Sequence, residues 1–194
     1  MLKTITVLGG DARQRYLAAR LMAGGFSVET CQVPGLPDSS AGLHAALCHA
    51  RAVALPMPAL TQDGWIRAGQ PIPLRSVLEC LRPQTLVFGG MLDAARELLA
   101  EYPVRVLDYA ESPALAAGNA VPTAEGAIRL AMEQRPATLD QSRCLVIGFG
   151  RIGKVLADRL RGLHAAVTVA ARKSEDRALS EAMGFAADRT GLYL

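Results

Sequence analysis

Three glycines with a regular spacing follow an apolar run in the last third of the chain. The segment LVIGFGRIG (145–153) has the pattern G-x-G-x-x-G, and a helical pattern starts near Arg151. In this context the glycines allow a tight turn, close backbone approach to a pyrophosphate and close helix–strand packing, while the helix N-terminus offers free N–H groups. We therefore expect a dinucleotide-binding loop formed by Gly148, Phe149, Gly150, Arg151, Ile152 and Gly153. The alternative is a glycine-rich turn without a ligand.

The end of the next apolar run indicates which dinucleotide this loop would hold. NAD sites usually have an acidic residue there, which binds the ribose 2′-hydroxyl. This chain instead has Arg172, Lys173 and Ser174. The two cations attract a 2′-phosphate, arginine can bind it with two hydrogen bonds, and serine adds a hydroxyl donor. The sequence thus favours NADP as the cofactor, with an exposed basic turn as the alternative.

An alternation of strands and helices along the chain must position these residues. Short β-rich apolar runs alternate with segments of helical periodicity, which is typical of parallel strands joined by right-handed crossovers. The expected strands of the first part are 4–10, 27–33, 52–57, 85–90 and 104–109, and its expected helices are 11–25, 43–50, 74–82 and 92–101. Ligands of such sheets bind beyond the carboxyl ends of the strands.

We expect this α/β chain to have three parts. Residues 1–121 form an N-terminal flavodoxin-like or Rossmann-like parallel-sheet domain for substrate or partner, 122–137 an interdomain helix, and 138–194 a partial Rossmann dinucleotide-binding domain. Thr123 is expected to cap the interdomain helix, and Pro136 to end it.

The first and last parts resemble each other. Residues 17–28 (LAARLMAGGFSV) align with 156–167 (LADRLRGLHAAV). In this alignment Asp11 and Gln14 stand where the last part has the second and third glycines of its motif. Because the motif is incomplete there, we expect that the first part does not bind a dinucleotide.

The composition excludes several classes of protein. The 194 residues are 51% hydrophobic and 20% charged, and the net charge of +3 comes without a basic cluster. This favours a globular protein that binds neither nucleic acid nor membrane. No apolar run is long enough to span a bilayer, and MLKTITVLGG lacks the features of a signal peptide.

The four cysteines form no C-x-x-C pair, and the three histidines lie at no metal-ligand spacing beside them. We therefore expect a cytoplasmic protein with reduced thiols and no metal.

Four segments together resemble one family. With GGDARQ near its start, NAVPTAEGAI (119–128), LVIGFGRIGK and VAARK, the chain is similar to dipicolinate synthase A, and more loosely to two-domain dehydrogenases of the shikimate and methylenetetrahydrofolate type. The resemblance implies a role in sporulation. It also implies an NADP-dependent oxidation of a dihydrodipicolinate-type intermediate of the lysine/diaminopimelate branch to dipicolinate. The implied partner is dipicolinate synthase B, a flavoprotein-like second subunit, and a homo-oligomer is also compatible. Members of the family continue further than this chain, so we expect 138–194 to hold only the first mononucleotide-binding half.

A small dicarboxylate substrate needs cations or N–H groups for its carboxylates and a group that takes up a proton. The expected catalytic residues are Asn119, Thr123 and Glu125, since the N-terminus of the interdomain helix can hold a carboxylate. The ordinary alternatives are an N-cap for Thr123 and a first-turn acid for Glu125. The expected substrate-binding residues are Asp11, Arg13, Gly89 and Gly90, at the carboxyl ends of predicted strands. Here the alternatives are a helix cap for Asp11 and a plain turn for the glycines.

Three functions remain in competition. The first is an NADP-dependent oxidoreductase subunit of the dipicolinate synthase type. The second is a non-catalytic NADP-binding module, and the third is a related dehydrogenase that acts on another small acid. Hydrolase chemistry is not expected, because no Ser–His–Asp or reactive-cysteine arrangement is visible.

Overall fold

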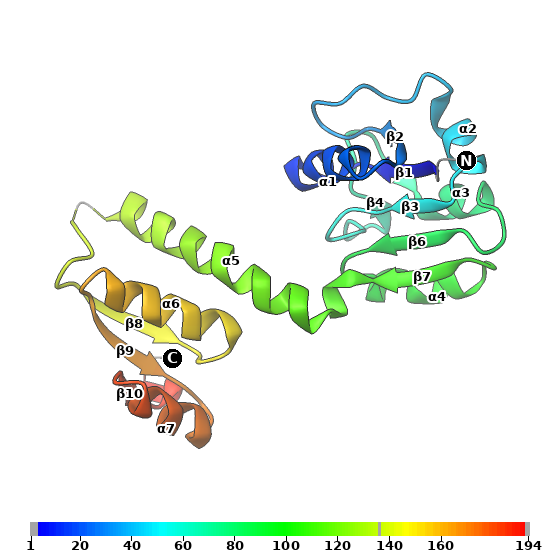
Figure 1. Ribbon diagram of the computed structural model, residues 1–194. Coiled ribbons are helices and arrows are strands. Elements are labelled where there is room, and N and C mark those ends of the chain that lie inside the picture. Colours follow the sequence, from blue (N-terminus) through cyan, green and yellow to red (C-terminus); the bar gives the residue numbers. More distant parts are fainter. Residues whose placement is uncertain (1–3, 136, 193–194) are drawn as a thin grey trace. The chain divides into compact units, whose positions relative to one another are not determined.

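The apolar runs form the strands of two separate parallel sheets (Figure 1). The computed structural model describes residues 4–135 and 137–192. Contacts between Cα atoms divide the chain into two units, Met1–Ser112 and Pro113–Leu194, hereafter unit 1 and unit 2. Each unit has its own core.

Unit 1 is a doubly wound sheet of five parallel strands in the order β2-β1-β3-β6-β7. Its strands are β1 (Thr4–Leu8), β2 (Ser27–Cys31), β3 (Ala52–Ala54), β6 (Leu86–Gly89) and β7 (Arg105–Asp108). Its helices are α1 (Ala12–Ala23), α2 (Gly42–Cys48), α3 (Leu74–Glu79), η1 (Asp93–Ala95), α4 (Arg96–Ala100) and η2 (Tyr109–Glu111). This strand order is the flavodoxin-like one, so the expected fold class is confirmed. The order reverses between β1 and β3, where such folds bind their ligands.

Both faces of this sheet are covered, because side chains alternate between them. Val53 of β3 belongs to the cluster that packs against α2, α3 and α4, which contribute Leu47, Val77 and Leu99. Its neighbours Ala52 and Ala54 belong to the cluster on the other face, where Ala18 of α1 packs. Strands buried on both sides explain the continuous apolar runs in the sequence.

A small hairpin lies between residues 58 and 73, to which the sequence analysis assigned neither a strand nor a helix. Strands β4 (Trp65–Ile66) and β5 (Ile72–Pro73) pair antiparallel. After β4, the carbonyl of Arg67 accepts a hydrogen bond from the N–H of Gly10 at 2.6 Å. The hairpin therefore places Arg67 at the carboxyl end of β1. Periodicity does not reveal strands of two residues, so this element was missed.

Unit 2 contains a sheet of three parallel strands in the order β10-β9-β8. Its elements are α5 (Pro113–Gln134), β8 (Arg143–Ile147), α6 (Arg151–Gly162), β9 (Ala166–Ala170), α7 (Ser174–Ala182), β10 (Ala186–Asp188) and η3 (Thr190–Leu192). Right-handed crossovers in one direction place α6 and α7 on the same face. On β8, Leu145 is 40% exposed and Ile147 54% exposed. Three parallel strands joined by helices give this unit a Rossmann-like arrangement.

The helix expected from Thr123 begins ten residues earlier, at Pro113, and contains Pro122. Pro113 fits the first turn, where the missing N–H has no intrahelical acceptor in any case. Thr123 was expected to cap the start of this helix, and that prediction was wrong. The helix packs against α6 and is part of unit 2. Pro136, the expected end, lies outside the described residues.

No helix within residues 4–135 and 137–192 is long and apolar enough to cross a membrane. The expected cytoplasmic location stays a prediction.

Candidate functional site

The turn between β8 and α6 has the backbone that close approach of a ligand requires. Gly148 follows β8 with φ +95°, a conformation that favours glycine. A Cβ atom on Gly150 would meet nothing within 4 Å, so the space above the turn is open. On Gly153, in contrast, a Cβ atom would lie 2.0 Å from the carbonyl oxygen of Gly148. The third glycine therefore allows helix and turn to pack closely, as its place in the motif predicts.

The N-terminus of α6 is open toward this turn. Gly150 is the N-cap residue and makes no side-chain capping bond, so the first N–H groups of the helix have no intrahelical acceptor. Arg151 is exposed and Ile152 is 43% exposed. The ring of Phe149 is buried in the core and lies edge-on to Phe185, with centroids 6.2 Å apart. Phe149 thus anchors the turn to the core of the unit.

A pocket of about 750 Å³ lies at the carboxyl ends of the three strands of unit 2. It is lined by residues 147–150 after β8, by residues 171–173 and Asp176 after β9, and by residues 189–191 after β10. Ligands of open parallel sheets bind at this end of the strands. The sequence analysis missed Asp176 and 189–191, because it did not predict the third strand that brings 189–191 here.

The cations expected to select the dinucleotide lie in this pocket. Arg172 and Lys173 line it, and both are exposed. Arg177 supports their loop, since its Nη1 donates to the carbonyls of Ala171 at 2.9 Å and Arg172 at 2.8 Å. Ser174 is the exposed first residue of α7. Arg189 adds a third cation to the pocket lining. Three cations therefore line this pocket together with one carboxylate, that of Asp176.

Unit 1 has a different arrangement at the corresponding turn. Asp11 caps α1, accepting a bond from the N–H of Arg13 at 2.9 Å. The same carboxylate accepts hydrogen bonds from Nε of Arg13 at 3.0 Å and from Nη2 of Arg13 at 2.8 Å. These hydrogen bonds from Arg13 lower the pKa of Asp11 to about 2. The structure therefore shows the capping alternative for Asp11, and it gives Arg13 a fixed orientation.

Gly89 and Gly90, expected at the substrate, are both buried. A Cβ atom on Gly89 would lie 3.0 Å from Cβ of Leu55, and one on Gly90 would lie 2.7 Å from Cγ of Met57. Close packing therefore explains both glycines. After them, the Asp108 carboxylate accepts bonds from the N–H groups of Met91, Leu92 and Ala110 at 3.2, 2.7 and 2.8 Å.

The three expected catalytic residues lie on α5, in its interior rather than at its N-terminus. The hydroxyl of Thr123 donates to the carbonyl of Asn119 at 2.7 Å, so Thr123 is not an N-cap. Glu125 is not a first-turn acid; it forms an ion pair with Arg159 of α6 at 3.3 Å. Asn119 is exposed. Its role at the substrate stays a prediction.

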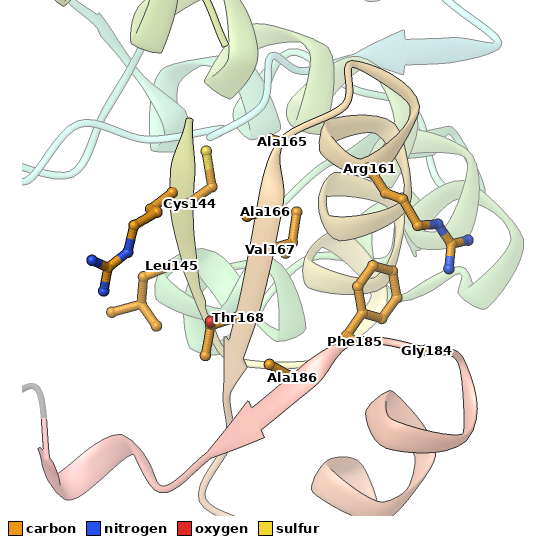
Figure 2. Close-up of a pocket in the computed structure, with 11 residues that line it drawn as sticks. Cys144, Leu145, Arg161, Ala165, Ala166, Val167, Thr168, Gly184, Phe185 and Ala186 are labelled. Atoms are coloured by element: carbon orange, nitrogen blue, oxygen red, sulfur yellow. The ribbon is translucent and has the colours of Figure 1, made fainter. Parts of the chain in front are cut away.

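A second hollow, of about 790 Å³, lies at the opposite ends of the strands of unit 2. Figure 2 shows Arg161 beside Phe185 at this site, with the guanidinium carbon 4.6 Å from the ring centroid. Arg143, Ala166 and Ala186, the first residues of the three strands, line it. It is therefore at the wrong edge of the sheet for the cofactor. No group of three or more potential metal ligands occurs in the described part of the chain.

The open glycine turn and the pocket beside it are features of the Rossmann fold. The D-lactate dehydrogenase of Lactobacillus jensenii, solved with NAD+, matches 97% of this chain and 58% of its own length, at 12% identity and a TM-score of 0.52. At this identity the likeness shows the fold alone, which is dehydrogenase-like.

The family model for the N-terminal domain of dipicolinate synthase A matches residues 4–110. The chain belongs to this family, as the sequence analysis predicted. Dipicolinate synthase A of Bacillus subtilis (strain 168) is 28% identical over 193 residues, which cover 93% of this chain and 64% of the relative. The structure of dipicolinate synthase A from Bacillus halodurans matches 96% of this chain and 68% of its own, at 23% identity and a TM-score of 0.82. The chain thus spans less than two thirds of its curated relative.

Proposed function

We propose that this chain is an NADP-dependent oxidoreductase subunit that oxidises a dihydrodipicolinate-type ring to dipicolinate, together with a second, flavoprotein-like subunit. The observation that supports dinucleotide binding is the turn at 148–153, where a Cβ atom on Gly153 would lie 2.0 Å from the carbonyl oxygen of Gly148. Membership of the family supports the proposed substrate.

The residues of unit 2 fit a dinucleotide bearing a 2′-phosphate. The turn at 148–150 and the N-terminus of α6 would hold the pyrophosphate, and Arg172 and Lys173 the 2′-phosphate. When bound, NADP+ accepts the hydride that the ring loses. The ring also releases one proton, which a base or water takes up, so that atoms and electrons balance.

Among the expected catalytic residues, Asn119 is the candidate for a hydrogen bond to the substrate. Glu125 is paired with Arg159, and the hydroxyl of Thr123 is directed to the backbone of its own helix. We therefore propose that Thr123 and Glu125 help to position α5, and that Asn119 contacts the substrate directly.

The first experiment titrates the 194-residue chain with NADPH and NADH, read by nicotinamide fluorescence. We expect Arg172→Asp to weaken NADPH binding about tenfold to a hundredfold, the value of a charge-assisted hydrogen bond, and to leave NADH binding nearly unchanged. Arg135→Asp is the control, because it makes the same charge change at an exposed residue outside the pocket.

Three outcomes separate the candidate functions. Binding of NADPH and its formation from a dihydrodipicolinate with the second subunit present supports the proposal. NADPH binding without turnover favours a non-catalytic module, and turnover with another small acid favours a related dehydrogenase. Equal loss of NADPH binding in Arg172→Asp and Arg135→Asp would contradict the role of Arg172.

A further inference from the structure

The guanidinium group of Arg13 in unit 1 is fixed by hydrogen bonds on one side and leaves Nη1 on the other side available to a ligand. Nε and Nη2 bond the Asp11 carboxylate, and Nη2 also donates to the carbonyl of Met57 at 2.6 Å. Within the described residues, Nη1 has no partner, and the side chain is 64% exposed. Since Asp11 follows β1 and Met57 follows β3, the group is fixed at the switch point of the sheet.

A second arginine lies at the same edge. The carbonyl of Arg67 accepts the N–H of Gly10 at 2.6 Å, which places Arg67 next to the turn that carries Asp11. Its charge also lowers the pKa of Asp11, after the larger effect of Arg13. The Arg67 residue is exposed, and no carboxylate of residues 4–135 or 137–192 forms an ion pair with it.

Two acids at this edge, Asp11 and Asp108, are already occupied as acceptors, and a third, Asp38, accepts the N–H of Gln32 after β2. Asp11 binds Arg13, and Asp108 accepts three backbone N–H groups. The unused hydrogen-bonding capacity therefore belongs to donors, namely Nη1 of Arg13 and the guanidinium group of Arg67. Tyr109 lies near Met57 as well, because a Cβ atom on Gly90 would lie 2.9 Å from both Sδ of Met57 and Cε2 of Tyr109.

We propose that Arg13 and Arg67 form a binding site for a small dicarboxylate at the carboxyl edge of the unit 1 sheet, with Asp11 as the residue that positions Arg13. One carboxylate binds Nη1 of Arg13 and the other binds Arg67, while Tyr109 offers a hydroxyl donor beside them. The proposal rests on the proposed function for the identity of the ligand, and it names Arg67 and Tyr109, which the sequence analysis did not select.

The test is a calorimetric titration of the 194-residue chain with dipicolinate, without nucleotide and in metal-free buffer. Picolinate, which has one carboxylate, is the second probe. We expect Arg13→Ala and Arg67→Ala each to weaken dipicolinate binding about tenfold or more, the value of a charge-assisted hydrogen bond. Arg67→Ala should affect picolinate less than dipicolinate. Arg20→Ala, an exposed arginine in the last turn of the same helix α1, should leave both affinities unchanged.

Loss of binding in Arg13→Ala and Arg67→Ala, with circular dichroism unchanged and Arg20→Ala normal, establishes the site. Equal affinities in all four proteins, an equal loss in Arg20→Ala, or no binding of dipicolinate to the unchanged chain would overturn it. These results are independent of the NADPH titration, because that experiment reads a pocket in unit 2. Failure of the cofactor proposal and failure of this one are therefore distinguishable.

Discussion

Gly153 and Gln14 occupy equivalent places in the two units, and they explain why one turn is open and the other is filled. At Gly153 there is no side chain, and none would fit. At the unit 1 turn, Gln14 is buried, and a Cβ atom on Gly10 would lie 2.3 Å from its Cγ. The Asp11 carboxylate also takes the place at the helix N-terminus where a pyrophosphate would bind. Both features argue against a dinucleotide in unit 1.

The first residue-scale prediction concerns Gly153→Ala. The new methyl group would collide with the carbonyl of Gly148, so we expect the free energy of unfolding to fall by about 1–3 kcal/mol, the usual effect of overpacking. NADPH binding should be lost, because the turn must move. Urea unfolding and NADPH fluorescence measure the two effects. Gly162→Ala is the matched control on the same helix: its methyl group would meet nothing within 4 Å, and it should be neutral or stabilising.

The second residue-scale prediction concerns acid stability and Asp11. Its pKa falls from 3.8 to about 2 on folding, chiefly through the hydrogen bonds from Arg13. A lowered pKa stabilises the fold above pH 3.8, and this contribution is lost as the pH falls from 3.8 to about 2. Asp11→Asn keeps a helix cap but removes the charge. The stability difference between the two proteins should therefore shrink over that range in urea unfolding. Because the Asp11–Arg13 ion pair is exposed, the difference in the free energy of unfolding between the two proteins at neutral pH should stay below about 1 kcal/mol. A difference that is constant with pH would contradict the assignment.

At the scale of elements, α5 is the largest departure from the sequence-based expectation. A proline inside a helix removes one hydrogen bond and crowds the preceding turn. In α5 the hydroxyl of Thr123 bonds the carbonyl of Asn119 one turn back, next to Pro122. On the side toward α6, Ala120 and Ala124 are buried, and Glu125 pairs with Arg159. Packing of small residues against α6 therefore keeps the helix continuous through the proline.

This explanation predicts that Pro122→Ala stabilises unit 2. Alanine restores the missing N–H, so we expect the free energy of unfolding to rise by about 1–3 kcal/mol. Far-UV circular dichroism during urea unfolding reads the change. Pro113→Ala, at the first helical residue, should be within about 0.5 kcal/mol of the original. Destabilisation by Pro122→Ala would show instead that the helix needs the proline.

At the scale of the whole molecule, the buried clusters on the two faces of the unit 1 sheet belong to unit 1, and a separate cluster belongs to unit 2. The proposed dinucleotide pocket is built from unit 2 alone, and the two proposed carboxylate-binding arginines lie in unit 1. The two proposed ligands can therefore be studied one at a time in the same chain.

This separation predicts that NADPH raises the stability of unit 2 alone. A ligand at a hundred times its Kd adds about 2.7 kcal/mol to the unit that binds it. Trp65, the single tryptophan of the chain, lies in unit 1 and reports on that unit. Amide hydrogen exchange should slow in β8, β9 and β10, while the urea midpoint of Trp65 fluorescence stays constant. A common shift of both signals would show that the units unfold together.

The sequence by itself determined the features that depend on neighbouring residues. The alternation of apolar runs and helical patterns, the glycines at 148–153 and the cations at 172–173 are all local. A turn that requires glycine keeps this requirement, and a loop with two cations after a strand keeps its charge, wherever the unit folds. The α/β class, the parallel strands and the glycine turn after β8 were therefore predictable.

Only the tertiary structure decided the features that depend on residues far apart in the chain. The hairpin at 65–73 brings Arg67 beside the turn that carries Asp11, and the strand β10 brings 189–191 to the proposed dinucleotide pocket. The sequence also placed the start of the interdomain helix at Thr123, whereas α5 begins at Pro113 and stays continuous through Pro122 while it packs against α6. In each case the free energy of long-range pairing or burial outweighs a weak local preference. That balance cannot be read from residue spacing.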